Sequence, residues 1–265
     1  MNIFQAITNA EIIDGVLIIK DCIIDSYTDS LETIVNTAGL IKLKTYDKVK
    51  FENVTFAKSI ENELEELQYD FGVYGRVIFE NCSFHLNSRI FAFYINMTNC
   101  EIGGKIMQIE GNILLDNCHT VMDRHAPTIH IMHGRTMGGL TINKSTLYNL
   151  CISNYTSNIK MEDSEVKNLT ITECQLGSII ETNTKHDTIH IRNTMIGMFL
   201  ARNAKVINTM TLECVSTTST FQSDNKIKEL NAQWTVFRYA PDIKDYDQTA
   251  RKFYYTQFLQ ESTNS

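Results

Sequence analysis

Short runs in which apolar and polar residues alternate recur along the chain, and many of them contain a polar pair at the same place. The clearest copies run from Phe79 to Phe84, from Met97 to Ile102 and from Leu115 to Thr120, each with an Asn-Cys pair in the middle. The Asn-Cys pairs are 18 residues apart twice in succession. Because alternation with a period of two is typical of β-strands, this pattern predicts short strands joined by tight corners.

Two further ladders of polar pairs follow in the second half of the chain, each with a spacing of 19 or 20 residues. One contains Lys144-Ser145, Asp163-Ser164, Asn183-Thr184 and Asn203-Ala204, and the other contains Asn154-Tyr155, Glu173-Cys174, Asn193-Thr194 and Glu213-Cys214. The ladders are offset by half a repeat, so each repeat is expected to turn at two equivalent corners. Since one repeat cannot bury its apolar face alone, the copies must stack as coils, with Asn side chains hydrogen-bonded along the stack.

The ladders also outline the organisation of the chain. The stretch from Ile3 to Asp25 is expected to form the opening strands. The repeat lengthens near residues 59–69 and 122–139, which predicts an inserted loop at each place. We therefore expect a solenoid over residues 1–224 and a separate cap region over residues 225–265.

An amphipathic helix is predicted after Pro241. The aromatic residues Tyr246, Phe253, Tyr254 and Phe258 recur with helical spacing in this stretch. Such a helix must bury its aromatic stripe, either by capping the last coil or by forming an interface with a second copy or another protein.

The phrases Phe79 to Phe84, Leu115 to Val121 and Ile191 to Ile196 resemble the repeats of right-handed parallel β-helix families, the pectate-lyase-like solenoids and phage tailspikes. The resemblance covers about residues 10 to 220. It implies an all-β, single-stranded right-handed parallel β-helix, here followed by the C-terminal amphipathic α-helix, and a phage or bacterial origin. A weaker resemblance to pentapeptide-repeat proteins rests on a similar repeat length.

Composition narrows the range of functions. The formal net charge is −7, which argues against broad attraction to nucleic acid or to an anionic membrane surface. The chain has no apolar run of membrane-spanning length and no signal-peptide pattern at its start, so we expect a cytoplasmic or virion-associated protein. Seven cysteines occur without a Cys-x-x-Cys pair, so buried free thiols are expected and no metal or cofactor.

Histidines supply the strongest chemical candidates. The phrase Thr-Ile-His-Ile occurs at His130 and again at His190, 60 residues later, so both side chains are expected on one face about 14 Å apart at three strand spacings. The candidate surface site comprises Asp123, Arg124, His130, His133, His190 and Arg192. Such groups can supply an acid, a base and an anion-binding cation. Alternatively, these residues simply occupy outward strand positions, which are ordinarily polar.

Carboxylates give a second chemical possibility. Asp116, Asp163 and Asp187 could contribute to the paired carboxylates of a polysaccharide-cleaving solenoid. Inverting hydrolysis needs two carboxyl groups about 6.5 to 9.5 Å apart. The single Trp argues against an extended sugar-binding platform, and no catalytic residue is assigned.

Three hypotheses of function follow. The leading one is a non-enzymatic interaction or structural protein that presents a rigid face to a macromolecular partner, with self-association through the C-terminal segment. The second is a carbohydrate-binding or carbohydrate-cleaving β-helix of tailspike type. The third is an acidic solenoid that imitates DNA and inhibits a nucleic-acid enzyme, without binding nucleic acid itself.

Overall fold

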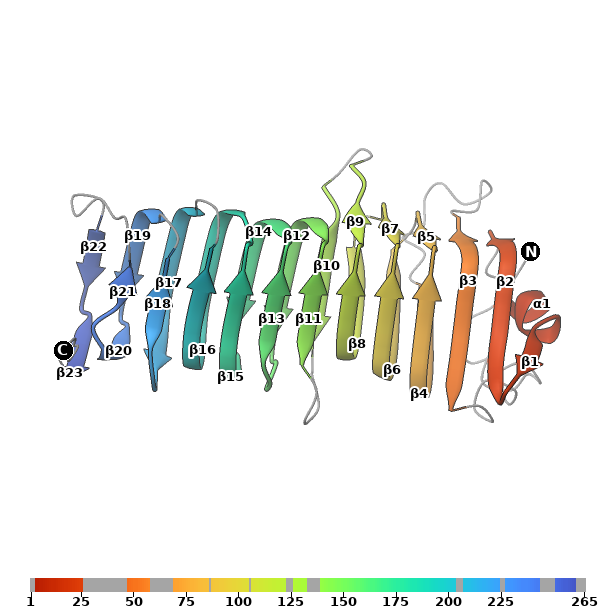
Figure 1. Cartoon of the computed structure of the whole chain (residues 1–265), viewed down its shortest axis with the longest axis horizontal. Coiled ribbons are helices and arrows are strands. Elements are labelled where there is room, and N and C mark those ends of the chain that lie inside the picture. The colour runs from red at the N-terminus through yellow and green to blue at the C-terminus, as the bar shows by residue number, and fades with distance from the viewer. Residues whose placement is uncertain are drawn as a thin grey trace. The chain divides into compact units, whose positions relative to one another are not determined.

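The computed structural model consists almost entirely of β-strands. It describes residues 3–25, 47–57, 69–85, 87–104, 106–122, 126–132, 139–203, 207–224, 227–243 and 251–260. The chain divides into two compact units, Met1–Ile129 and His130–Ser265. Parallel strands stack rung upon rung in each unit, which confirms the expected parallel β-helix (Figure 1). Of the predicted insertions, residues 59–68, 123–125 and 133–138 lie outside the described residues.

The first unit opens with a helix and a hairpin and continues as parallel rungs. Its elements are α1 (Ile3–Thr8), β1 (Glu11–Ile13), β2 (Val16–Ile24), β3 (Lys48–Phe56), β4 (Tyr69–Glu80), β5 (Ser83–Phe84), β6 (Ser88–Thr98), β7 (Glu101–Ile102), β8 (Ile106–Asp116) and β9 (His119–Thr120). Strands β2, β3, β4, β6 and β8 pair in parallel, one for each rung. The short strands β5, β7 and β9 continue each rung after its corner.

Aromatic side chains stack along the interior of this unit. The rings of Phe51 and Phe79, which are partners in register, lie 5.1 Å apart between centroids, and those of Phe56 and Phe84 lie 4.7 Å apart. Both separations are close to the roughly 4.8 Å spacing of neighbouring strands. All four side chains are fully buried, so the apolar positions of the repeated phrase form a continuous core.

The second unit repeats this design with longer rungs. Its elements are β11 (Leu140–Asn143), β12 (Thr146–Ser153), β13 (Ile159–Glu162), β14 (Glu165–Thr172), β15 (Gln175–Thr182), β16 (His186–Arg202), β17 (Ile207–Thr217), β18 (Phe221–Ser223), β19 (Ile227–Gln233), β20 (Val236–Tyr239), β21 (Asp242–Ile243), β22 (Arg251–Tyr254) and β23 (Gln257–Gln260), and the boundary between the units falls within β10 (Thr128–Met132). Strands β12, β14, β16, β17, β19 and β22 form one stack. The other stack contains β11, β13, β15, the second half of β16, β18 and β21.

Each sharp corner is made by one residue with a positive φ, between 46° and 56°. In the first unit these residues are Asp21, Asn53, Asn81, Asn99 and Asn117, and in the second they are Lys144, Asp163, Asn183 and Asn203 at one corner and Asn154, Glu173, Asn193, Cys214, Trp234 and Tyr255 at the other. Asn tolerates this left-handed conformation better than most residues, which explains its recurrence. The predicted corners are confirmed except one, because Cys214 and not Glu213 takes the positive φ.

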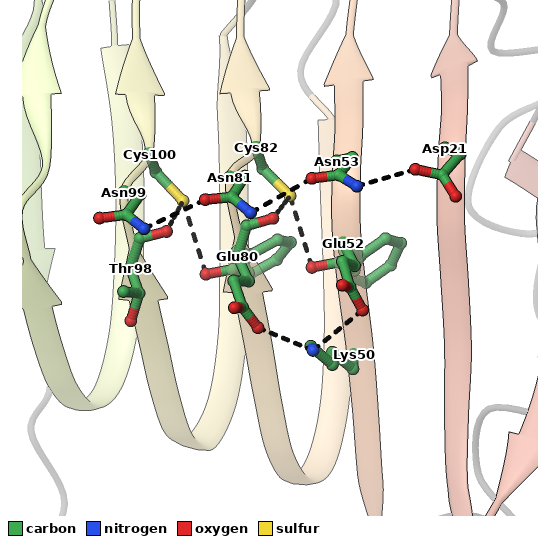
Figure 2. A network of polar contacts seen from close by, with 12 residues as sticks. Asp21, Lys50, Glu52, Asn53, Glu80, Asn81, Cys82, Thr98, Asn99 and Cys100 are labelled. Atoms are coloured by element: carbon green, nitrogen blue, oxygen red, sulfur yellow. Dashed lines mark hydrogen bonds and ion pairs between the residues drawn. The ribbon is translucent and has the colours of Figure 1, made fainter.

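The corner residues of the first unit are joined by a ladder of side-chain hydrogen bonds (Figure 2). The Nδ2 atom of Asn99 donates to Oδ1 of Asn81 at 3.1 Å. On the next rung, Asn117 donates to Asn99 at 2.8 Å. The ladder continues from Asn81 to Asn53 and ends on the carboxylate of Asp21. Since every amide donates in the same direction, the terminal Asp21 needs only to accept.

At many corners the side chain of the next residue satisfies backbone carbonyl groups. The thiol of Cys82 lies 3.5 Å from the carbonyl oxygen of Phe51 on the preceding rung and 3.4 Å from that of Glu80 (Figure 2). The hydroxyl groups of Ser164 and Thr235 contact two carbonyl groups in the same way. The Asn-Cys phrase is therefore a corner followed by an inward hydrogen-bond donor.

The beginning of the chain differs from the sequence-based expectation. Residues Ile3–Thr8 form helix α1 and not a strand, and Ala6 and Ile7 are buried. Strand β1 then pairs antiparallel with β2. The helix and hairpin together cover the outer edge of the first rung.

The predicted C-terminal amphipathic helix is wrong for the described residues. Strands β22 and β23 form a further rung, in which Phe253 is the register partner of Ala232 and Phe258 that of Phe237. The two rings belong to strands on either side of the corner residue Tyr255. Tyr246 lies outside the described residues.

The amide ladder can be tested at its centre. The variant Asn99→Ala removes two side-chain hydrogen bonds. Alanine also tolerates a positive φ less well than asparagine does, because its side chain cannot form a local hydrogen bond. We therefore expect the free energy of unfolding to fall by about 1–3 kcal/mol. The variant Asn99→Gly loses the same hydrogen bonds but adopts the corner conformation readily, and it should lose less. Urea denaturation measures both. An alanine variant as stable as the glycine variant would contradict this account of the corner.

Candidate functional site

The most regular outward surface of the second unit, which we call the polar face, comprises the outward side chains of β12, β14, β16, β17 and β19. They form three rows in register: Asn149, Asn168, Thr188, Thr209 and Glu229; Cys151, Thr170, His190, Thr211 and Asn231; Ser153, Thr172, Arg192, Glu213 and Gln233. The inward positions between the rows are Leu, Ile, Met and Ala residues that are buried. Strand alternation thus places the candidates His190 and Arg192 on one surface, with Ile191 in the core between them.

A carboxylate joins these two candidates. The Oε2 atom of Glu213 lies 3.8 Å from Nε2 of His190 and 3.6 Å from Nε of Arg192. The three side chains are 34% to 55% exposed, so solvent screens their attraction and the cluster contributes little to stability. The arrangement leaves a histidine, a cation and a carboxylate accessible to a partner.

His130 also belongs to the second unit. Its Nε2 atom lies 2.9 Å from the hydroxyl oxygen of Ser153, the first member of the row that continues through Thr172 to Arg192. Burial lowers the pKa of His130 below its ordinary value, which favours the neutral ring. Of the other predicted residues, Asp123, Arg124 and His133 lie outside the described residues.

A second acid–histidine pair lies inside the second unit and was not predicted. Glu181 and His186 are both fully buried, with Oε2 of Glu181 3.4 Å from Nε2 of His186. The other ring nitrogen of His186 donates to the carbonyl oxygen of Val166 at 2.8 Å, and the hydroxyl of Thr184 donates to Glu181. Glu181 is the register partner of Met161 on the preceding rung and of Ala201 on the next. It therefore lies at an inward position that is apolar on the neighbouring rungs.

This pair predicts a pH dependence of stability. Burial lowers the pKa of His186, but the Glu181 carboxylate outweighs it and the pKa lies above its ordinary value of 6.5. When the pKa of a histidine is higher in the folded state than in the unfolded state, its protonation stabilises the fold. This stabilisation is complete below the unfolded-state pKa and is lost as the pH rises through the folded-state pKa. We therefore expect the urea midpoint to fall as the pH rises above the ordinary histidine pKa of 6.5, in part because of this pair.

Two variants isolate the contribution. Glu181→Gln removes the charge that holds the proton on His186, so this component of the pH dependence should disappear in urea titrations. His190→Gln, at an exposed position of the same strand, should keep the wild-type profile. Identical pH profiles for Glu181→Gln and the wild type would show that the buried pair is not charged.

Four of the seven cysteines, Cys82, Cys100, Cys118 and Cys174, are buried. Cys82, Cys100 and Cys118 occupy equivalent positions on successive rungs and are 0% to 1% exposed. The pKa of Cys100 lies far above its ordinary value because the neighbouring thiols of Cys118 and Cys82, together with burial, disfavour a thiolate. In the second unit burial raises the pKa of Cys174 to about 11. Hydrogen bonding with Cys100 instead lowers the pKa of Cys82 and of Cys118 below the ordinary value. The neutral thiols of Cys100 and Cys174 fit the hydrogen bonds that they donate to carbonyl groups.

Several carboxylates of the described residues are held by ion pairs and amides. Glu52 and Glu80 lie on adjacent rungs, and both contact Nζ of Lys50, at 2.9 and 2.7 Å (Figure 2). Asp163 accepts from Asn183 at 2.6 Å, and Asp187 accepts from Asn208 at 3.3 Å. None of these contacts joins two carboxylates in the manner of a general acid and its base.

One cavity lies between α1 and β2 in the first unit. Its volume is about 150 Å³, and it is lined by Ala6, Asn9, Ala10, Glu11, Ile18, Ile19, Lys20 and Cys22. The two charged groups in this lining, Lys20 and Glu11, already contact one another at 2.9 Å. Their pairing leaves a small and mainly apolar space.

Comparison with known proteins adds no assignment, because no family model, no curated protein and no solved structure matches the chain. In the part of the chain that the structure describes, no group of three or more His, Cys, Asp or Glu residues is placed to hold a metal ion. No described helix is long and apolar enough to cross a membrane. Any functional proposal must therefore rest on the arrangement of side chains on the described surfaces.

Proposed function

We propose that the chain is a non-enzymatic interaction or structural protein that presents its polar face to a macromolecular partner. The observation that carries this proposal is the register of that face. Its short Asn, Thr and Ser side chains repeat at each rung, and the cluster of His190, Arg192 and Glu213 lies among them. A partner with groups repeated at the strand spacing of about 4.8 Å can form hydrogen bonds with several rungs at once.

Short side chains suit such a surface physically. Thr and Ser lose little conformational entropy when a partner covers them, in contrast to Lys or Glu. Some of them are already oriented along the rows, since Asn168 donates to Asn149 at 2.8 Å and Thr188 donates to Asn168 at 2.9 Å. Electrostatic complementarity to the charged cluster would then set the position of the partner along the face.

Substitutions on the face test the proposal. The double variant Thr170→Lys/Thr211→Lys adds two long charged side chains on either side of His190 and should abolish capture of a specific partner from an extract of the native host. The control Lys160→Glu changes an exposed residue on the other stack and should capture the same partner as the wild type. Quantitative mass spectrometry compares the three baits. Equal recovery with all three would contradict a role for the polar face.

A carbohydrate ligand is the second candidate, and a cluster in the first unit favours it. Phe91, Phe93 and Tyr94 are 40% to 50% exposed at an irregularity of β6, and Arg76 lies 5.3 Å from the Tyr94 ring. Exposed aromatic rings beside an arginine are a combination that can pack against a sugar ring and bind one of its hydroxyl groups.

Glycan binding is therefore expected to depend on these rings. Phe93→Ala/Tyr94→Ala should remove binding on a glycan array and in calorimetry with the glycan so identified, because it deletes the exposed aromatic surface. Trp234→Ala, which deletes an exposed ring of the second unit, should leave it unchanged. A wild-type protein that binds no glycan on the array would rule out this second candidate.

Imitation of duplex DNA has weaker support. It needs carboxylates in continuous tracks, whereas Glu52 and Glu80 share Lys50 and Glu165 pairs with Lys185 at 2.7 Å. Lysines interleaved with carboxylates reduce the negative potential of these rows.

A further inference from the structure

The rung formed by β22 and β23 exposes apolar side chains that earlier rungs bury. Phe258 is 47% exposed, whereas its register partner Phe237 is fully buried. In the described part of the second unit, every exposed large apolar side chain except Met195 lies on this rung or the one before it: Trp234, Tyr254, Tyr255, Phe258 and Leu259. The exposed apolar surface of the unit is thus concentrated at one place.

Strand β23 also has an edge that no described strand occupies. The backbone N–H of Gln257 donates to the carbonyl oxygen of Thr235, so Gln257 points toward the preceding rung. Backbone groups of successive strand residues point to opposite sides. The N–H and C=O groups of Phe258 therefore point away from β20, its one strand partner among the described residues.

In the part of the chain that the structure describes, this edge lacks most of the features that ordinarily prevent strand addition. Exposed edges are usually protected by a very short strand, charged residues, Pro or a covering helix. Strand β23 is short, with four residues, but Gln257, Phe258 and Leu259 carry neither charge nor Pro. In the first unit, by contrast, β1 pairs with β2 and α1 packs beside it. The unprotected edge of β23 is consequently a site where another strand can add.

We infer that β23 pairs antiparallel with β23 of a second copy of the chain, so that two molecules join through this rung. The register follows from two constraints. Residues directly opposite one another in a sheet must face the same side, and the hydrogen-bonded pairs must use backbone groups on the free edge. Phe258 opposite its own counterpart satisfies both, because its ring faces the interior and its backbone groups face the edge.

The same register explains why a second copy fits as the occupant. It places Gln257 opposite Leu259 of the other molecule, so no like charges meet. It also lets the stack of Phe237 and Phe258, whose rings are 5.8 Å apart with 12° between their planes, continue into the second molecule. The inference goes beyond the proposed function, since it uses a different surface and does not depend on the polar face.

The mass of the full chain in solution tests this pairing. Light scattering coupled to size exclusion should give twice the mass of one chain at high micromolar concentration and one chain on dilution. The variant Gln257→Lys/Leu259→Lys changes two exposed side chains and should remain a monomer, because each lysine would face a lysine of the other copy. Met195→Lys, an equal change at an exposed apolar residue away from this rung, should dimerise like the wild type. Circular dichroism verifies that each variant is folded.

Variants of opposite charge provide a second test, because an unfolded protein would not regain association when the two variants are mixed. The variant Gln257→Glu/Leu259→Glu should also be a monomer alone, and mixing it with the lysine variant should restore a dimer that contains one of each. A wild type that remains monomeric at all concentrations would overturn the inference. So would a lysine variant that still dimerises, or a mixture of the two variants that fails to associate.

Discussion

The corner after each strand is the constraint on which the rest of the structure depends. To fold back within two residues, the chain needs a residue with positive φ, and it turns carbonyl groups toward an interior without water. At many corners the residue that follows donates hydrogen bonds inward, as Cys100 does to Phe79 and Thr98 and as Thr256 does to Ala232 and Tyr254. A small donor at this position satisfies carbonyl groups as well as fitting the space, although Val54 and Val215 occupy it at two corners.

This constraint explains which rungs can be recognised in the sequence and which cannot. The phrase from Phe79 to Phe84 can be recognised because Asn is the residue that most readily takes the corner. The rung at the C-terminal end follows the same rule, with Phe253, Tyr255, Thr256 and Phe258 in the places of Phe79, Asn81, Cys82 and Phe84. Its corner residue is Tyr and not Asn, so the phrase is hard to recognise, and the spacing of Phe253, Tyr254 and Phe258 from Tyr246 matches helical periodicity instead.

The candidate site was predictable only where it followed strand alternation. His190 and Arg192 are two residues apart, so a strand necessarily places them on one face. Glu213 was missed because the rung there is 21 residues long, which moves the corner to Cys214 and turns Glu213 outward beside Arg192. Glu181 and His186 were missed for a different reason: polar residues are expected outward, and only the stacked register shows that both point into the core.

Trp234 and Tyr255 connect the corner constraint with association. Bulky residues at positive φ are unfavourable by about 1–2 kcal/mol each, yet two successive rungs have them. Their rings stack at 4.2 Å with 7° between the planes, an interaction that takes the place of the amide hydrogen bonds between Asn corners. The exchange leaves rings that are 52% and 73% exposed beside the unprotected edge of β23. Stacked aromatic rings can therefore join successive corners where the chain has no Asn ladder.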